Sequence, residues 1–134
     1  MTEALRQAAV VPVSDGQVCM VTSSSGKRWI VPKGMIDPGH TAGEAALIEA
    51  WEEAGLVGVL RPEPAGSYVY QKYGRTHHVI VFVMEVAEAL ADWPERTIRR
   101  REWVHPDTAA DRVDELSLKL IIESLFKTET ADVA

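Results

Sequence analysis

The sequence predicts one mixed α/β domain, and three observations support this fold class. First, 134 residues with 46% hydrophobic and 25% charged side chains are a length and composition typical of a single globular core. Second, short β-rich runs alternate with clusters of Gly, Pro, Asp and Ser. Third, two segments, 41–56 and 116–126, carry apolar residues at helical spacing. The sequence has no repeat, linker or low-complexity tract, so we expect one domain over residues 1–134.

The first part of the chain is expected to form short strands. The apolar run 8–13 and the segment 17–22 flank an Asp-Gly step at 15–16, an arrangement typical of a β-hairpin. After a further turn cluster, a third short strand is expected over 28–31. The Pro-Lys-Gly sequence at 32–34 then interrupts the strand pattern.

The pattern changes to helical spacing at residue 41 and returns to strands after Gly55, which is a plausible helix stop. Residues 67–73 alternate in the manner of a strand, with Tyr68, Tyr70 and Lys72 on one face. The run from 78 to 86 is the strongest strand signal in the chain. The strands expected after the first helix are 57–60, 67–73, 78–86 and 102–104, and residues 116–126 are expected to form a closing helix.

Charge and composition exclude several classes of function. The formal net charge of -6 argues against a broad electrostatic grip on nucleic acid. No segment approaches the run of about 20 apolar residues needed to span a bilayer, and the polar N-terminus lacks the apolar stretch of a signal peptide. We therefore expect a cytoplasmic protein without a membrane or nucleic-acid partner. Cys19, the single cysteine, lies in an apolar run and is expected to be a buried structural thiol.

The first predicted helix carries three clustered carboxylates. Helical spacing groups Leu47, Ala50, Trp51 and Ala54 on one face, which is expected to pack, and Glu49, Glu52 and Glu53 on the opposite face. Like charges at this spacing destabilise a bare helix by about 0.2–0.5 kcal/mol per pair. A hard divalent cation would turn that repulsion into attraction, because such cations select carboxylate oxygens. From spacing alone, a solvated acidic face is the favoured interpretation, and a metal site is the alternative.

The residues around this helix resemble the Nudix box, whose pattern is G-x5-E-x7-R-E-U-x-E-E-x-G-U with U aliphatic. The residues that stand in register without insertion are Gly34, Glu49, Glu52, Glu53, Gly55 and Leu56, with Ala50 as a small version of the first aliphatic position. The segments 29–34 (WIVPKG) and 99–103 (RRREW) extend the likeness to the diphosphoinositol-polyphosphate phosphohydrolase-like branch. The resemblance implies a Nudix-like α/β/α sandwich with a mixed β-sheet, in which residues 34–56 form the box.

Two box positions depart from this pattern. His40 stands where the first Glu of the pattern is expected, and Ile48 stands where the Arg is expected. In the family that arginine helps to orient the carboxylates, whereas Ile48 cannot donate a hydrogen bond. Losing a nearby positive charge is expected to raise the pKa values of the glutamates and to weaken their preorganisation. A degenerate, non-catalytic Nudix domain that binds a phosphorylated ligand is therefore an alternative to an enzyme. An interaction domain with an acidic surface, which would bind no metal, is a further alternative.

The resemblance implies a hydrolase that cleaves a diphosphate linkage in a phosphorylated small molecule, such as a diphosphoinositol polyphosphate or a dinucleoside polyphosphate. It implies that Glu49, Glu52 and Glu53 are catalytic and hold Mg²⁺ or Mn²⁺, and that Lys33 adds its main-chain carbonyl to the metal. Either Glu49 or Glu53 is expected to position or deprotonate the attacking water. The family includes monomers and homodimers, so both assembly states stay open.

Phosphate groups require positive side chains, and short basic clusters are candidates for this role. The expected substrate-binding residues are Arg28, Lys33, Lys72, Arg75 and His78. For the run 99–101, a surface location is the favoured interpretation, because neighbouring strand residues face opposite ways. For the same reason, His77 and His78 are not expected to bind one metal ion together. The tyrosines at 68, 70 and 73 either pack half-buried in the sheet, which is favoured, or stack on a base.

Overall fold

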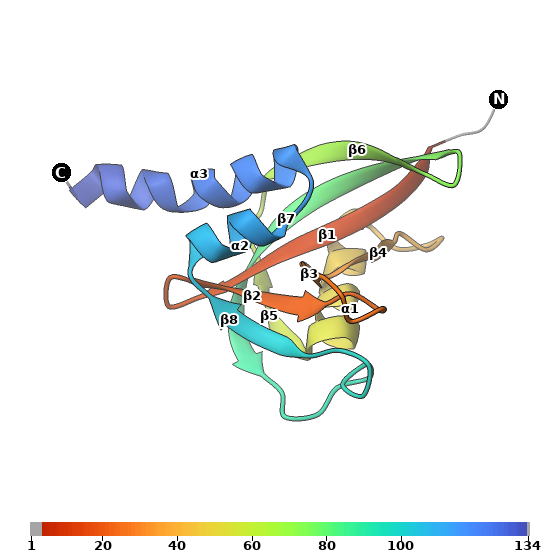
Figure 1. Ribbon diagram of the computed structural model, residues 1–134, viewed down its shortest axis with the longest axis horizontal. Helices are drawn as coiled ribbons and strands as arrows, with labels where there is room; N and C mark the ends of the chain where they lie inside the picture. The colour runs from red at the N-terminus through yellow and green to blue at the C-terminus, as the bar shows by residue number, and fades with distance from the viewer. Residues whose placement is uncertain (1–3, 134) are drawn as a thin grey trace.

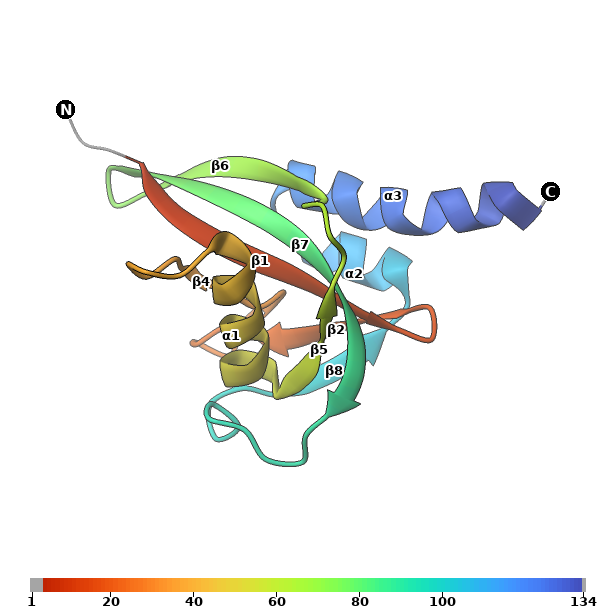
Figure 2. The ribbon, with the colours of Figure 1, turned by 180° about the vertical axis from the view of Figure 1, so that it is seen from behind.

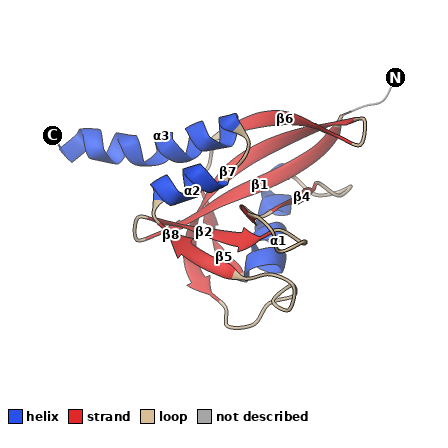
Figure 3. Cartoon of the chain, viewed as in Figure 1, coloured by secondary structure: helices blue, strands red, loops and turns tan. Residues whose placement is uncertain are grey.

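The computed structural model describes residues 4–133, with side chains described through residue 126. Its elements in chain order are β1 (Leu5–Ser14), β2 (Gln17–Thr22), β3 (Trp29–Ile30), β4 (Lys33–Met35), α1 (Ala42–Ala54), β5 (Leu56–Leu60), β6 (Gly66–Lys72), β7 (Arg75–Ala89), β8 (Arg101–Val104), α2 (Pro106–Arg112) and α3 (Leu116–Val133). Figure 3 shows how the helices and strands are distributed along the described chain. Each strand and helix expected from the sequence is present, with its ends shifted by a few residues.

The strands form one mixed sheet built on a long central pair. β1 runs parallel to β7, from Leu5 opposite His77 to Val13 opposite Glu85, while the other neighbours are antiparallel. β6 pairs with the first half of β7 and β5 with its second half. On the other side, β4 pairs with β1, and β3 and β8 both pair with β2. α1 covers one face of this sheet, and α2 and α3 lie on the opposite face (Figures 1 and 2). The predicted α/β/α sandwich is confirmed.

Alternation along the central strands divides the core into two halves. In β1, Ala9 and Val11 face the cluster beneath α2 and α3, whereas Ala8 and Val10 face the cluster beneath α1. A strand with one face in solvent alternates apolar and polar residues, whereas a strand buried on both faces is apolar at successive positions. This explains why the segment is a continuous apolar run. Cys19 is fully buried in the α1 half, as predicted, and this burial raises the pKa of its thiol to about 12.

The hairpin and helix ends have local causes that are visible in the sequence. Asp15 and Gly16 adopt φ values of 50° and 75°, as a two-residue turn between twisted strands requires, and Val13 pairs with Val18. At the start of α1, the Thr41 hydroxyl accepts from the Glu44 N–H and the Glu44 carboxylate accepts from the Thr41 N–H. Gly55 ends α1 in the left-handed conformation at φ 66°, which confirms the predicted stop.

The orientation of α1 differs from the prediction. Ala50 and Ala54 are fully buried as expected, but Leu47 and Trp51 are 37% and 45% exposed, and Glu53 is buried. Small alanine side chains allow the helix to lie close to the sheet, and this close approach leaves the indole of Trp51 on the outer side. The predictions that Leu47 and Trp51 pack and that Glu53 lies on the face opposite the packed one were therefore wrong.

Two short elements were not predicted. β4 occupies the Pro-Lys-Gly region that interrupts the strand pattern, and its Lys33 and Met35 pair with Ala9 and Gln7 of β1. α2 begins after His105, whose ring nitrogen Nδ1 accepts from the Asp107 N–H at 3.1 Å. Elements of three and seven residues are too short to produce a recognisable hydrophobic period. Within residues 4–133, none of the helices combines the length and apolar character required to cross a membrane.

Candidate active site

The carboxylate of Glu49 lies directly against the β4 backbone at Gly34. A Cβ atom built on Gly34 would overlap the carboxylate carbon and both oxygens of Glu49. Only glycine leaves this space, so the strand and the helix can approach each other here. The group that approaches the Gly34 backbone is the Glu49 side chain.

Glu53 is the most deeply buried acid of the candidate site, with its side chain 6% exposed. Its Oε1 atom accepts from the Lys33 N–H at 3.2 Å, and its Oε2 atom accepts from Arg99 Nη2 at 3.5 Å. Each carboxylate oxygen is therefore paired with a different element, β4 on one side and the segment before β8 on the other. Glu53 is thereby held between these two elements.

Burial and mutual repulsion raise the pKa values of this acid pair. Burial is the largest cause for both carboxyls, raising the pKa of Glu49 to about 7 and that of Glu53 to about 8. The charges of Glu52 and Glu49 raise these two pKa values further, while Arg99 lowers both. The predicted rise in pKa is confirmed, but its main cause is burial and not the loss of the box arginine.

Glu52 is half-buried next to this pair, and its charge acts on Glu49. Its backbone carbonyl accepts from the Glu95 N–H at 3.0 Å. In the described part of the chain, no three His, Cys, Asp or Glu residues are close enough together to form a metal site. Of the three predicted metal-binding glutamates, the structure brings together Glu49 and Glu53 and leaves Glu52 at the rim.

The segment between β7 and β8 wraps around the C-terminal end of α1, as the lower loop in Figure 2 shows. Trp93 Nε1 donates to the carbonyl of Glu53 at 3.0 Å. Arg101 Nη1 donates to the carbonyls of Ala54 and Leu90 at 2.8 and 2.9 Å. A guanidinium at this position also opposes the negative end of the helix dipole.

Arg99 and Arg101 were predicted to be surface residues, and this interpretation was wrong for both. Arg99 is only 10% exposed at its side chain, and it contacts Glu53 and Glu95. Two features of the sequence could have indicated such a contact. One is the arginine run itself, and the other is a neighbouring helix of 13 residues that contains four glutamates and no Lys or Arg.

Lys33 presents its ammonium group next to an aromatic side chain of β6. Its Nζ atom donates to the Tyr70 hydroxyl at 3.3 Å and lies 4.4 Å from the centroid of the same ring. The Tyr70 hydroxyl in turn donates to Gln7 Oε1 at 2.7 Å. This chain of contacts fixes the position of a cation one residue from Gly34, because each member holds the next.

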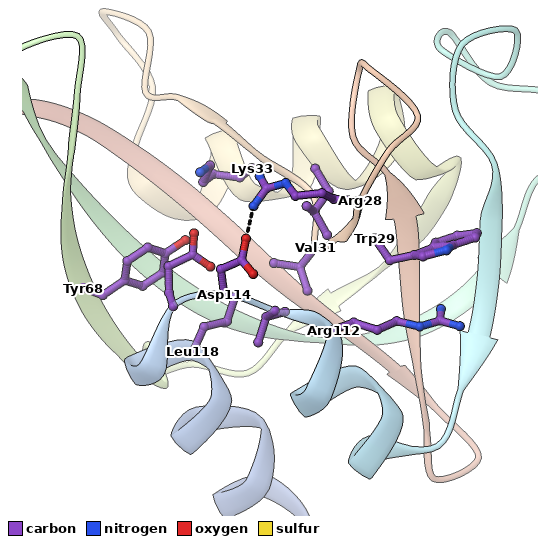
Figure 4. Close-up of a pocket in the computed structure, with 11 residues that line it drawn as sticks. Arg28, Trp29, Val31, Lys33, Tyr68, Arg112, Asp114 and Leu118 are labelled. Carbon is purple, nitrogen blue, oxygen red and sulfur yellow. Dashed lines mark hydrogen bonds and ion pairs between the residues drawn. The ribbon is translucent and has the colours of Figure 1, made fainter.

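A pocket opens beside Lys33, between the segment 28–33, β6 and the α2–α3 connection (Figure 4). Its lining includes Arg28, Trp29, Lys33, Tyr68, Arg112 and Leu118. Arg28 forms an ion pair with Asp114 across this pocket, and both side chains are more than half exposed. Arg28 and Lys33, two predicted substrate-binding residues, therefore line the same pocket.

The other three predicted substrate-binding residues lie on the β6–β7 hairpin and do not line this pocket. Lys72 and Arg75 face each other across the exposed turn, and His78 is half-buried opposite Val69. His77 stacks on Tyr70, with ring centroids 4.6 Å apart.

The interpretation of the tyrosines as packing residues is confirmed for two of the three. Tyr68 is 7% exposed and Tyr70 is half-buried, whereas Tyr73 in the hairpin turn is 92% exposed, so that interpretation was wrong for Tyr73.

The residues of the buried pair are suited to a hard divalent cation. Two adjacent carboxylates with raised pKa values supply an all-oxygen donor set and a local excess of negative charge. Mg²⁺ usually takes one or two protein carboxylates and completes its shell with water and phosphate oxygens. Glu49 and Glu53 fit this requirement, with Glu52 at the rim as a third oxygen donor.

Comparisons with known proteins point to one family. A family model described as the NUDIX domain matches residues 4–123. Nudix hydrolase 13, mitochondrial, of Arabidopsis thaliana is 33% identical over 105 residues, covering 71% of this chain and 52% of the relative. Diphosphoinositol polyphosphate phosphohydrolase 3-beta of Homo sapiens is 38% identical over 98 residues, covering 71% of this chain and 58% of the relative. The chain thus spans about half the length of the curated relatives it matches.

A solved structure shares the fold. The crystal structure of a C. elegans Ap4A hydrolase binary complex superposes with a TM-score of 0.79, covering 96% of this chain and 99% of the other. At 17% sequence identity, this likeness concerns the arrangement of helices and strands.

Proposed function

The chain belongs to the Nudix family, and from this premise we propose that it is a divalent-cation-dependent hydrolase that cleaves a diphosphate linkage in a phosphorylated small molecule. The observation that carries the proposal is a pair of adjacent carboxylates on α1, with half-buried Glu49 against Gly34 and buried Glu53 held by the Lys33 N–H and by Arg99. A carboxylate pair attracts a divalent cation, and that cation in turn binds phosphate oxygens.

Glu49 and Glu53 would hold Mg²⁺ or Mn²⁺, with Glu52 and the main-chain carbonyl of Lys33 as additional oxygen donors. The bound ion would supply Lewis-acid stabilisation of the phosphate oxygens. Either Glu49 or Glu53 would accept the proton of the attacking water at a carboxylate oxygen. A base is most effective when its pKa lies near the working pH, and burial raises both pKa values toward neutrality.

Lys33 and Arg28 would bind the phosphate groups of the substrate. Lys33 is held by Tyr70 and so presents a fixed point charge, whereas Arg28 offers a planar fork that suits two phosphate oxygens. Lys72, Arg75 and His78 would contact a substrate only if it extends to the β6–β7 hairpin. Compact, highly charged substrates such as diphosphoinositol polyphosphates fit this distribution of cations, and dinucleoside polyphosphates are the second class. The human relative named above is a diphosphoinositol polyphosphate phosphohydrolase, which supports the first class.

A hydrolysis assay that separates and identifies the phosphorylated products tests this function. The substrates would be a diphosphoinositol polyphosphate, a dinucleoside polyphosphate, ADP-ribose and a nucleoside triphosphate, each with Mg²⁺, with Mn²⁺ and with excess chelator. We expect metal-dependent turnover that is fastest on the diphosphoinositol polyphosphate, and that falls by at least about 100-fold in Glu49→Gln, because the variant loses a charged metal ligand. If folded protein binds metal but turns over none of these substrates, the hydrolase proposal is contradicted and the alternative, a non-catalytic domain that binds a phosphorylated ligand, is favoured.

A further inference from the structure

The helix that carries the buried acids supplies no positive charge to them. α1 contains Glu44, Glu49, Glu52 and Glu53 and no Lys or Arg, and Ile48 has no hydrogen-bond donor in its side chain. Two adjacent carboxylates without a counter-charge repel each other. The charge that balances them must therefore come from another part of the chain.

Arg99 provides this charge from the segment before β8. Its guanidinium is fixed by two short contacts that do not involve the acid pair. Its Nε atom donates to Glu95 Oε1 at 2.7 Å, and its Nη1 atom donates to the Thr22 carbonyl at 2.8 Å. The remaining nitrogen, Nη2, lies 3.5 Å from Glu53 Oε2, and the side chain is 10% exposed. The planar fork thus faces Glu53 in one orientation.

We propose that Arg99 is the positioning residue of the metal centre, where it holds the Glu53 carboxylate in the one orientation that it presents to a divalent cation. Glu95 and the Thr22 carbonyl anchor the arginine, and the Lys33 N–H holds the other oxygen of Glu53. The inference rests on the proposed function only in that a divalent cation occupies the site. In the family the box arginine helps to orient the carboxylates, but this chain has Ile48 at that position. The proposal assigns this role to Arg99, which lies outside the helix.

The sign of the change in metal affinity distinguishes this role from a simple charge effect. A guanidinium that only adds positive charge repels Mn²⁺, so its removal would tighten Mn²⁺ binding. A guanidinium that positions Glu53 has the opposite effect, because without it one oxygen of this carboxylate loses its partner and the cation must order the side chain when it binds. Loss of such supporting contacts typically weakens metal binding by about 10–100-fold.

The experiment measures Mn²⁺ binding by the substrate-free protein, by electron paramagnetic resonance of free Mn²⁺ and by calorimetry at constant pH. The variants are Arg99→Gln and Arg99→Lys, and the matched control is Arg96→Gln. Arg96 lies in the same segment but pairs with Asp92 at 3.6 Å and is 59% exposed. We expect binding at least about tenfold weaker in Arg99→Gln and within about twofold of wild type in Arg96→Gln.

Arg99→Lys keeps the charge but has no fork to span three partners, so we expect it to recover only a minor part of the affinity. Thermal unfolding would show which variants fold. If Arg99→Gln does not fold, Arg99→Lys alone tests the proposal. We then expect it to bind Mn²⁺ about threefold or more weaker than wild type. Unchanged or tighter Mn²⁺ binding in the folded variants would overturn the proposal.

The outcomes also separate this inference from the proposed function. If wild-type protein binds Mn²⁺ but hydrolyses no substrate, the proposed hydrolase function is contradicted. The role of Arg99 is then still tested by Mn²⁺ binding to the Arg99 variants. Wild-type protein that turns over substrate, with an Arg99→Gln variant that binds Mn²⁺ normally, would contradict only the role of Arg99. Wild-type protein that binds no Mn²⁺ would contradict both.

Discussion

The Glu49 carboxylate fills the space that a side chain would occupy at Gly34, so a residue of α1 and a residue of β4 share one position in the site. The contact joins the two ends of the box, and the adjacent Lys33 N–H binds Glu53 at 3.2 Å. β4 is only three residues long, but it sets the positions of both buried acids. The geometry of the site therefore depends on this short strand as much as on the helix.

Gly34→Ala is expected to displace Glu49 and to weaken both Mn²⁺ binding and turnover by at least about tenfold, because the new methyl group would overlap the carboxylate. Calorimetric titration with Mn²⁺ and an activity assay would measure these changes. Gly43→Ala is the matched control, since its Cβ would lie no closer than 3.4 Å to Leu60 Cδ1 and 4.0 Å to Thr41 Oγ1. Equal behaviour of the two variants would show that the space at Gly34 is not required.

Tyr70→Phe is expected to raise KM for the phosphorylated substrate by about threefold or more and to lower the free energy of unfolding by about 1 kcal/mol. The change removes the acceptor of Lys33 and leaves Gln7 Oε1, in a side chain that is mostly buried, without its donor. Steady-state kinetics and chemical denaturation would measure the two effects. Tyr73→Phe, at a position 92% exposed, should change neither quantity. An unaltered KM in Tyr70→Phe would remove Lys33 from the proposed phosphate site.

Gly55→Ala is expected to destabilise the protein by at least about 1 kcal/mol, because an L side chain is strained in the left-handed conformation that ends α1. The added Cβ would also lie 2.9 Å from three atoms of the Trp93 side chain. Denaturant unfolding would measure the loss. Gly74→Ala has a similar φ of 72° but open space around its Cβ, so it should cost less. Equal losses would mean that the contact with Trp93 adds nothing to the backbone strain.

The stability of the metal-free protein is expected to fall as the pH rises from about 5 to about 8. The pKa values of Glu49 and Glu53 in the folded protein are about 7 and about 8, above the ordinary value of 4.5. In this range the folded state keeps protons that the unfolded state has lost, so raising the pH favours unfolding.

Denaturant unfolding at pH values across that range would measure the effect, which should be on the order of 1–3 kcal/mol. Saturating Mn²⁺ should reduce the loss, since the cation stabilises the ionised carboxylates. Glu53→Gln should flatten the pH dependence. A stability that rises with pH in the metal-free wild type would be incompatible with two buried carboxylic acids.

Local signals in the sequence predicted much of the fold. The Asp15-Gly16 turn, the stop at Gly55 and the apolar runs of β1 and β7 follow from the residues themselves. The sequence did not predict which face of α1 is buried. Trp51 is a stronger apolar residue than any alanine, but the space between helix and sheet admits only small side chains.

Only part of the site could be predicted from the sequence. Gly34 and the box glutamates stand at recognisable spacing, but the burial of Glu53 was not foreseen. The partnership of Arg99 with Glu53 joins residues 46 positions apart and depends on how the segment before β8 folds around α1. Contacts of this kind arise from tertiary packing and leave no periodic pattern in the sequence.

The most direct test of the account is the Mn²⁺-dependent rate of phosphate release by Glu53→Gln relative to wild type. Glu63→Gln, at an exposed position outside the site, is the matched control. The buried acid pair predicts a fall in kcat of at least about 1,000-fold for Glu53→Gln, since the variant loses a charged metal ligand and a possible base, and no change for the control. A folded Glu53→Gln protein that retains wild-type kcat would contradict the assignment of this pair as the catalytic centre.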